Sequence, residues 1–308
     1  MMSVRVVKYA TGAVAAVCLF YFSGCQHPES SVSPPAETPE SAPVTVAPEP
    51  SFEPGVRDAD PNIVPVAASD SSAAPGPEPL ARERSLLVLE LFTSEGCSSC
   101  PPADRNLQTI HAGREQLDDE VVVLSWHVDY WNYLGWKDPF SFREASQRQR
   151  RYAARLKTGV FTPQLIVNGA QSAVGSRSAE VARAINRGRL APAALISVST
   201  GLERGGTCRV VVEYDNVPMG GVVLIGLAQK SAVVNVSVGE NGGRKLEHVN
   251  VVRNFQQKRA TSTKGRVATV LQLPEGLTSG AANIFVLLQT TGAGEVLDAA
   301  LLPLKPLT

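Results

Sequence analysis

The sequence predicts an α/β domain, in which strands alternate with helices, followed by a mostly β, sandwich-like domain. Between residues 86 and 191, apolar runs of strand length alternate with stretches in which apolar residues recur at helical spacing. From about Pro192, strand-like runs follow one another and are separated by Gly-rich turns, which is typical of a β-sandwich. We therefore expect one domain over 86–191 and a second over 192–308.

Composition limits the partners of this protein. The chain has 308 residues, of which 44% are hydrophobic, so it can bury a sizeable core. Its 29 Lys and Arg residues balance its 29 Asp and Glu residues. A balanced charge does not provide the broad basic surface that nucleic acids require, so we expect no nucleic-acid partner.

Residues 1–25 have the pattern of an export signal. Arg5 and Lys8 precede an apolar core from Ala13 to Phe22, and small residues follow it. The apolar core is shorter than the run of about 20 residues that a membrane-spanning helix needs. This pattern predicts that the chain leaves the cytoplasm.

The end of this signal resembles the lipobox of bacterial lipoproteins. In "FSGC" the lipidated residue is Cys25, and Gln26 after it implies delivery to the outer membrane, on the periplasmic face. The alternative is an ordinary cleaved signal with an incidental cysteine and a secreted product. In either case we expect a compartment of the cell envelope or beyond, where disulfides persist.

Residues 26–85 have the composition of a disordered linker. This segment is rich in Pro, Ser and Ala, contains several acidic residues and has almost no aromatic residues. It cannot bury enough apolar surface to offset the entropy lost on ordering. We expect a tether between the membrane anchor and the folded part.

A Cys-x-x-Cys pair lies between the first strand and the first helix of the folded part. The apolar run Leu86 to Phe92 predicts the strand, and "PPADRNLQTIHAG" predicts the helix. A helix N-terminus stabilises a thiolate, which is the form of cysteine that attacks disulfides. We therefore expect Cys97 to be the exposed nucleophile and Cys100, one turn into the helix, to be the shielded resolving thiol.

Further elements are expected along the 86–191 segment. The residues from Val121 to Trp126 predict a strand. Ser141 with Glu144 forms a capping-box pattern, which predicts the start of the next helix. In "GVFTPQLIVNG" Pro163 opens a strand, where proline is tolerated. A turn or short hairpin strand follows, and "SRSAEVARAINRG" then predicts the last helix.

These features together resemble known families. Cys-x-x-Cys at a strand-to-helix junction, with Thr162-Pro163 before a later strand, resembles the thioredoxin fold, which implies a cis bond at Pro163 that faces the cysteines. The strings "SEGCSSCPPAD", "WHVDYW", "GWKDPF" and "TPQLIVNG" resemble the exported thioredoxin-like proteins catalogued as domain of unknown function 1223. Gly96 and Ser98-Ser99 depart from the residues of true thioredoxins. Since the dipeptide between the cysteines helps to set the reduction potential, the direction of electron flow stays open.

The function predicted from these residues is thiol-disulfide exchange on protein thiols or disulfides. Cys97 attacks, Cys100 resolves, Thr162 and Pro163 present the client, and the redox-active disulfide is the only cofactor. Glu90, on the strand before the pair, is a candidate for the buried acid that moves the proton of the resolving thiol. A salt-bridged or edge-exposed Glu90 is the alternative.

Two other functions remain open. A copper or zinc carrier would use Cys97, Cys100 and His127, because soft thiolates and imidazole suit these metals. A non-catalytic interaction module would keep the Cys-x-x-Cys pair as a structural disulfide. Neither alternative needs the pair to exchange with a client.

For the remaining arginine, aromatic and polar residues that stand out in the sequence, we expect structural roles. Four arginines of the second helix are expected on a solvated face: Arg148, Arg150, Arg151 and Arg155. Four aromatic residues are expected as a hydrophobic cover or a client-binding rim: Trp126, Tyr130, Trp131 and Trp136. His248 and Asn250 share one strand face and are expected to point to solvent, and a site on that face is the alternative. Cys208 is expected to be buried.

Overall fold

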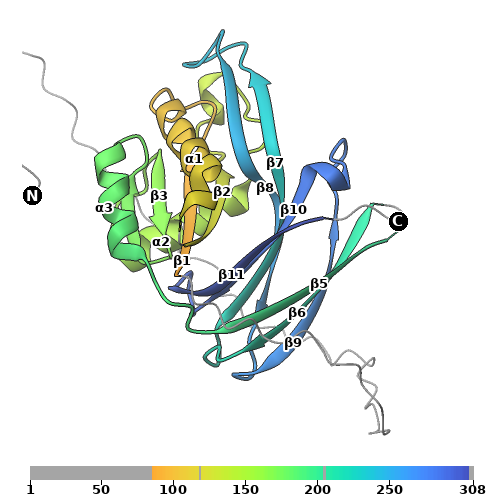
Figure 1. The fold of residues 1–308 in the computed structure, drawn as a ribbon. Helices are drawn as coiled ribbons and strands as arrows, with labels where there is room; N and C mark the ends of the chain where they lie inside the picture. Colours follow the sequence, from red (N-terminus) through yellow and green to blue (C-terminus); the bar gives the residue numbers. More distant parts are fainter. Residues whose placement is uncertain (1–84, 118, 204–205, 305–308) are drawn as a thin grey trace, which may run out of the picture. The chain divides into compact units, whose positions relative to one another are not determined.

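The computed structural model describes residues 85–117, 119–203 and 206–304 (Figure 1). The predicted export signal, the lipidation at Cys25 and the linker over 26–85 lie outside the described residues, except that Ser85 at the end of the linker is described. Within the described residues no helix is both long and apolar enough to span a bilayer.

The described residues form eleven strands, three α-helices and three short 3-10 helices. In chain order they are β1 (Leu86–Thr93), α1 (Pro101–Gly113), η1 (Arg114–Gln116), β2 (Glu120–His127), η2 (Asn132–Leu134), α2 (Arg143–Leu156), β3 (Gln164–Val167), β4 (Gln171–Val174), α3 (Ser178–Gly188), β5 (Leu195–Glu203), β6 (Thr207–Asp215), β7 (Val222–Asn235), β8 (Lys245–Arg259), β9 (Gly265–Gln272), η3 (Ser279–Ala281), β10 (Ala282–Gln289) and β11 (Val296–Pro303).

The strands form two sheets. The larger sheet has eight strands in the order β11-β10-β7-β8-β2-β1-β3-β4, and the smaller one has the order β5-β6-β9. In the larger sheet β1 pairs parallel with β2, and β2 pairs parallel with β8 at Ser125 and Val251. The other pairs of the larger sheet are antiparallel, so this sheet is mixed.

The predicted fold class is therefore wrong. We expected a thioredoxin-like α/β domain followed by a separate sandwich-like domain, but the protein is mostly β and its principal sheet is a mixed one of eight strands. The edge of β2 is covered by β8, a strand from far along the chain. Local hydrophobic periodicity does not reveal which distant strands pair, because pairing depends on edges and registers that only the folded sheet defines. The sandwich-like character of the second half does appear, in the stacking of the two sheets (Figure 1).

Both faces of the larger sheet are buried over its centre, and the ends of β7 and β8 are exposed. On one face, side chains of β2, β7, β8 and β10 pack with Tyr152 of α2 around Trp126. On the other face, Leu87, Leu89 and Leu91 of β1 pack against α1 and α3. Farther along that face, alternate residues of β7 and β10 pack against β6 of the smaller sheet. Strands buried on both faces consist of nearly continuous apolar residues, which explains runs such as "LLVLELF".

Most of the individual helices and strands form where the sequence predicts them. The strands and helices expected over 86–191 are present, including the short hairpin strand β4. The capping box at Ser141 is wrong, since Phe142 is the N-cap of α2 and no side chain caps it. Strand β11 was not predicted. Its apolar residues are interrupted by Asp298 and end at Pro303, which obscures the strand pattern.

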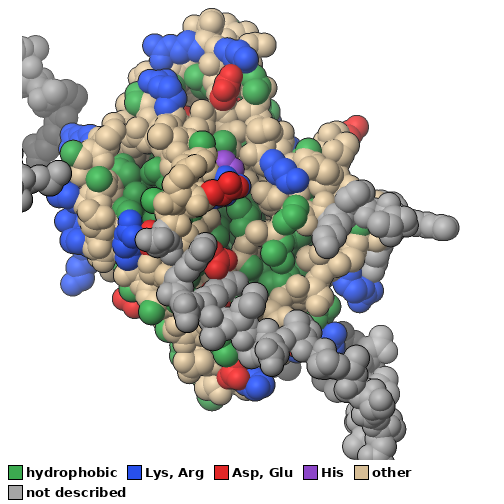
Figure 2. Space-filling model, in the orientation of Figure 1, with side chains coloured by type: hydrophobic (Ala, Val, Ile, Leu, Met, Phe, Trp, Pro, Cys, Tyr) green, Lys and Arg blue, Asp and Glu red, His purple; other side chains and the backbone are tan. Residues whose placement is uncertain are grey.

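The surface carries charges of both signs. On the face shown in Figure 2, acidic and basic side chains are interspersed, and basic ones gather at the end where β7 and β8 join. Apolar side chains on this face occur in patches between the polar ones (Figure 2).

Candidate functional site

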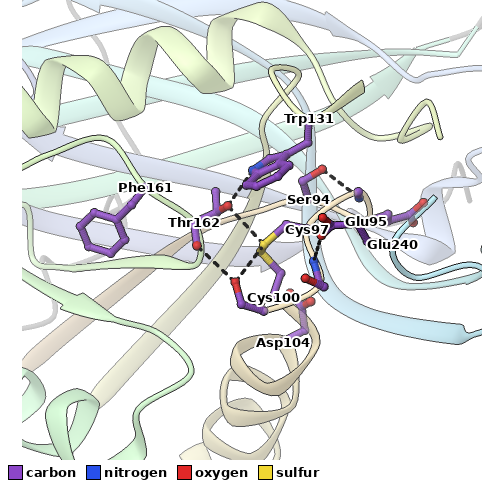
Figure 3. Close-up of a disulfide and its surroundings, with 12 residues drawn as sticks. Ser94, Glu95, Cys97, Cys100, Asp104, Trp131, Phe161, Thr162 and Glu240 are labelled. Atoms are coloured by element: carbon purple, nitrogen blue, oxygen red, sulfur yellow. Dashed lines mark hydrogen bonds between the residues drawn. A yellow bond between two sulfur atoms is a disulfide. The ribbon is translucent and has the colours of Figure 1, made fainter. Parts of the chain in front are cut away.

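The two cysteines of the Cys-x-x-Cys motif form a disulfide between β1 and α1 (Figure 3). The Cα atoms of Cys97 and Cys100 are 5.4 Å apart. Two backbone hydrogen bonds shape the loop: Cys97 N–H donates to the carbonyl of Ser94 at 3.2 Å, and Cys100 N–H donates to that of Cys97 at 3.1 Å. Pro101 begins α1, where the missing N–H of proline costs nothing. The disulfide therefore lies at the N-terminus of a 13-residue helix.

Two details of this arrangement differ from expectation. Cys97 was expected to be exposed, but only 1% of its surface is accessible, and Cys100 is fully buried. Cys100 was placed one turn into the helix, but it is the N-cap of α1. The exposed residues of the loop are Ser98 and Ser99, which lie between the cysteines. Within this loop, solvent therefore reaches the two serines and not the sulfurs.

Thr162 contacts the sulfur of Cys97. The Thr162–Pro163 peptide bond is cis, as the sequence resemblance implied. The Thr162 hydroxyl donates a hydrogen bond to Cys97 Sγ at 3.3 Å and accepts one from Trp131 Nε1 at 2.7 Å. An indole nitrogen can only donate, so the hydroxyl proton of Thr162 is left for the sulfur. This chain of donors, visible in Figure 3, favours negative charge on Cys97 Sγ.

Glu90 is not part of this site. Arg148 binds both of its carboxylate oxygens, at 2.6 and 2.9 Å, and Tyr152 donates to one of them. Glu90 lies on the α2 face of β1, whereas Leu89 and Leu91 face α1. The structure thus matches the salt-bridged alternative for Glu90.

The arginines of α2 do not all lie on a solvated face. Arg150, Arg151 and Arg155 are exposed, but Arg148 is buried, so the expectation for Arg148 is wrong. Burial alone would lower the pKa of Arg148, but the carboxylate of Glu90 outweighs it and raises the pKa. Arg148 is one of four arginines that lie close together in the sequence, and the sequence does not indicate which of them pairs with Glu90.

His127 is buried behind the disulfide loop and is paired with a carboxylate. Its Nδ1 lies 2.7 Å from Asp138 Oδ2, which also accepts the Glu95 N–H at 2.9 Å. Burial alone would raise the pKa of Asp138, but His127 and the backbone donors lower it overall. No group of three or more His, Cys, Asp or Glu side chains in the described part of the chain is arranged to hold a metal. The set Cys97, Cys100 and His127 is therefore not brought together as a metal site.

His248 and Asn250 were expected to face solvent, and this is wrong. Both are buried, with 2% and 0% of their surface accessible. The His248 ring lies 4.6 Å from the His127 ring, measured between centroids. Its Nε2 is 3.5 Å from Glu95 Oε1, and its Nδ1 is 3.6 Å from Asp104 Oδ1. Strand β8 pairs with β2 and lies beside α1, so its polar face is covered.

The turn between β7 and β8 holds the disulfide loop. Asn241 is fully buried, and its Nδ2 donates to the carbonyls of Glu95 and Cys97 at 2.8 and 2.9 Å. Glu240 accepts the Ser98 N–H at 3.0 Å (Figure 3). The Ser98 side chain first, and then its N–H, lower the pKa of Glu240. A segment more than 140 residues away along the sequence thus fixes the backbone around the cysteines.

The aromatic residues near the site have different positions. Trp126 lies in the core, with none of its surface accessible, so it is neither a cover nor a rim. Trp131 contacts Thr162, and Trp136 Nε1 donates to Glu95 Oε2 at 2.7 Å. Tyr130 donates to Gln149. Cys208 is buried, as expected.

Sequence reasoning missed the polar residues that surround the disulfide. Glu95 and Asp104 lie two residues before Cys97 and four after Cys100, and both are buried. An acidic residue on each side of the pair was a signal that could have been used. For Asn241 and His248 no such signal existed, because the contacts that bury them come from the pairing of β8 with the first half of the chain.

The fold and site define a mostly β protein that carries a Cys-x-x-Cys disulfide at the junction of a strand and a helix. The chain belongs to the family described as "Protein of unknown function (DUF1223)", whose model matches residues 88–289. The resemblance to domain of unknown function 1223 is thereby confirmed.

Two solved structures are similar to this chain. Protein AGR_C_4864 from Agrobacterium tumefaciens is 27% identical with a TM-score of 0.54, and the match covers 72% of this chain and 96% of that one. HBP35 of Porphyromonas gingivalis is 14% identical with a TM-score of 0.52, and the match covers 72% of this chain and 76% of that one. No curated protein matches the sequence.

Proposed function

We propose that this protein carries out thiol-disulfide exchange with protein thiols or disulfides through Cys97 and Cys100. The observation that carries the proposal is the hydrogen bond from the Thr162 hydroxyl to Cys97 Sγ at the N-terminus of α1. A thiolate is the attacking form of cysteine, and hydrogen-bond donors with a helix N-terminus stabilise it. A purely structural disulfide does not require such donors at one of its sulfurs.

The reaction has two steps in each direction. In reduction of a client, the Cys97 thiolate attacks one client sulfur, the client disulfide breaks, and the other client sulfur leaves as a thiolate. Cys100 then attacks Cys97 Sγ, which releases the second client thiolate and re-forms the Cys97–Cys100 disulfide. The client gains two electrons and the cysteine pair loses two. The reverse sequence oxidises a client dithiol.

Exposed apolar side chains near the disulfide loop are suited to an unfolded client segment. Trp131 and Thr162 are joined by a hydrogen bond, and each has an exposed apolar residue nearby in the sequence. Tyr133 follows Trp131 by two residues, and Val160 precedes Thr162 by two. Val238, two residues before Glu240, is also exposed. An extended client segment could add backbone hydrogen bonds beside Thr162, as peptides do at exposed strand edges.

The proposal is tested by redox titration and by trapping. We expect a reduction potential within the range of known exchange proteins, and faster alkylation of Cys97 than of Cys100 in the reduced protein. Cys100→Ser should accumulate mixed disulfides at Cys97, whereas Cys208→Ser, the matched control, should not. A potential well below about −300 mV, with equal alkylation of both cysteines, would instead identify a structural disulfide.

We also propose that exchange takes place in the cell envelope, with the chain held to a membrane by a lipid on Cys25. The support is the "FSGC" sequence after an apolar segment and the stability of disulfides in such compartments. Cys25→Ala should release the protein from the membrane fraction while leaving its disulfide exchange unchanged. Mass spectrometry that finds an unmodified Cys25 in the membrane-bound wild type would contradict this.

A further inference from the structure

The second step of the proposed exchange raises a problem of proton transfer. This inference rests on the proposed function. Cys100 is fully buried, and only its thiolate can attack Cys97 Sγ. Its thiol proton must therefore pass to a nearby buried group before it reaches solvent. Glu90 does not serve, because Arg148 and Tyr152 occupy its oxygens on the far face of β1.

Two other carboxylates flank the disulfide and are buried. Glu95 and Asp104 have 0% and 5% of their surface accessible. Both face His248, with separations of 3.5 and 3.6 Å, which are ion-pair contacts rather than hydrogen bonds. Glu95 Oε1 and Asp104 Oδ1 have no hydrogen-bond partner among the described residues. Buried carboxylate oxygens normally have such a partner, so each of these two oxygens can accept a further hydrogen bond.

Asp104 is placed to reach Cys100. It lies one helical turn after Cys100, and its N–H donates to the Cys100 carbonyl at 3.1 Å. Side chains of a helix tilt toward its N-terminus, so residues at i and i+4 lie over one another. Figure 3 shows Asp104 beside Cys100 at the start of α1, with Glu95 on the opposite side of the disulfide from Thr162.

The charges of the cluster favour uptake of a proton. Burial alone would lower the pKa of His248, but Asp104 and Glu95 outweigh it and raise this pKa to about 10, so the ring is a cation at neutral pH. With both carboxylates ionised, the three groups carry one net negative charge, which a proton from Cys100 neutralises. The neighbouring titratable groups are His127 with Asp138 on the β2 side, and Arg105, Lys245 and Glu247 toward solvent.

A groove connects Asp104 to solvent. It has a volume of about 160 Å³ and is lined by residues of α1 and β8 that include Asp104, Arg105, Gln108, Lys245 and Glu247. A proton on Asp104 can therefore leave through water in this groove, although Cys100 itself has no access to solvent.

We propose that Asp104 accepts the proton of the Cys100 thiol, with Glu95 and His248 as positioning residues, because His248 faces both carboxylates and holds the Asp104 side chain in place. As Cys100 Sγ bonds to Cys97 Sγ, the bond from Cys97 to the client breaks and the client sulfur leaves as a thiolate. The proton passes from Cys100 to the Asp104 carboxylate and then to water in the groove. In the reverse direction, Asp104 returns a proton to Cys100 when the disulfide opens.

The test uses the reduced full chain with Cys18, Cys25 and Cys208 replaced by Ser, so that only Cys97 and Cys100 react with the chromogenic disulfide DTNB. DTNB then releases one coloured thiolate in each of the two steps. We expect Asp104→Asn to leave the first release unchanged and to slow the second about 10²-fold near pH 7, the lower range for a positioned acid-base group. The loss should shrink as pH rises through about 8.5, where a thiol ionises without help. Asp104→Glu should restore most of the rate, and Glu115→Gln, an exposed acid, should behave as wild type.

The results that contradict the role of Asp104 differ from those that contradict the exchange function. If Asp104→Asn slows neither release, or slows both equally at all pH values, Asp104 is not the acceptor. If this variant does not fold, as judged by circular dichroism of the oxidised form, Glu95→Gln replaces it with the same expectation. If the wild type gives no second release, the proposed exchange function itself fails, and the role of Asp104 fails with it.

Discussion

Asn241 shows how a single side chain can hold the site. Its amide satisfies two carbonyls of the disulfide loop, those of Glu95 and Cys97, in a buried position. Asn241→Ala leaves the Glu95 carbonyl without a donor and the Cys97 carbonyl with only the Cys100 N–H, so we expect the free energy of unfolding of the oxidised protein to fall by about 1–3 kcal/mol. Urea denaturation measures it.

Asn235→Ala is the matched control for this prediction, because Asn235 is exposed at the end of β7. It should change the free energy of unfolding by less than about 0.5 kcal/mol, as is usual for surface substitutions. Equal effects of the two substitutions would show that Asn241 does not hold the loop.

The ionisation of His248 gives a dependence of stability on pH. Its pKa is about 10 in the folded chain and about 6.5 when unfolded. Between these values only the folded state binds the proton, so the stability that His248 contributes is fully present below about pH 6.5 and is lost as pH rises toward 10. His248→Gln should therefore be less stable than wild type near pH 6, and the difference should shrink by pH 10.

Urea titrations of the oxidised protein at several pH values check this prediction, since the disulfide removes the titration of Cys97 and Cys100. His111→Gln serves as control. Burial and Arg114 lower the pKa of His111, so this variant should not remove the loss of stability at high pH. A constant difference between His248→Gln and wild type from pH 6 to 10 would show that His248 is neutral in the folded state.

At this residue scale, the sequence could predict the cysteines, the helix N-terminus and the position of Thr162-Pro163, because each follows from local order along the chain. It could not predict which acid lies near the sulfurs. Glu90 was chosen from its place on the preceding strand, but alternation along β1 directs it toward α2, where Arg148 is its partner. Asp104 and Glu95 are nearer in sequence, and their importance depends on His248, which only the tertiary structure brings to them.

At the scale of elements, helix α2 is attached to the sheet through a buried ion pair. Arg148 binds Glu90 of β1 and Gln289 of β10, and its guanidinium lies 5.1 Å from the centroid of the Trp126 ring. Arg148→Ala leaves the Glu90 carboxylate buried without its cation. We expect a loss of about 3–5 kcal/mol in the free energy of unfolding, which urea denaturation measures.

Arg150→Ala is the control for the ion pair, since Arg150 is exposed on the same helix. It should have little effect on stability. The double variant Glu90→Leu with Arg148→Met should recover much of the loss, because replacing both members of a buried pair with apolar groups is often neutral. If Arg148→Ala proves as mild as Arg150→Ala, the pair contributes nothing to the attachment of α2.

At the scale of the whole molecule, the elements were predictable but their assembly was not. Runs such as "LLVLELFT" and "ANIFVLLQ" are mostly apolar, which indicates strands buried on both faces, and every residue of β1 and β10 is buried. Nothing in such a run specifies its neighbour. The order β7-β8-β2-β1 arises because β8 fits beside β2, and this contact joins segments more than 120 residues apart. The expectation of a self-contained α/β domain failed at this one edge.

The pairing of β2 with β8 predicts that residues 85–191 do not fold by themselves. Trp126 of β2 packs against Phe255 of β8 and Phe285 of β10, with ring centroids 5.2 and 5.9 Å away, and Ser125 Oγ donates to the Val249 carbonyl at 2.8 Å. Without β7, β8 and β10 the fragment exposes an unpaired strand edge and loses the cover of its largest core side chain. Burial of each aromatic side chain contributes about 1.5–3 kcal/mol, a loss that a fragment of this size tolerates poorly. We therefore expect the 85–191 fragment to show no cooperative urea transition and poorly dispersed amide resonances, whereas the 85–308 chain unfolds cooperatively. A fragment that unfolds cooperatively with its disulfide intact would mean that β8 merely lies against a unit already complete at residue 191.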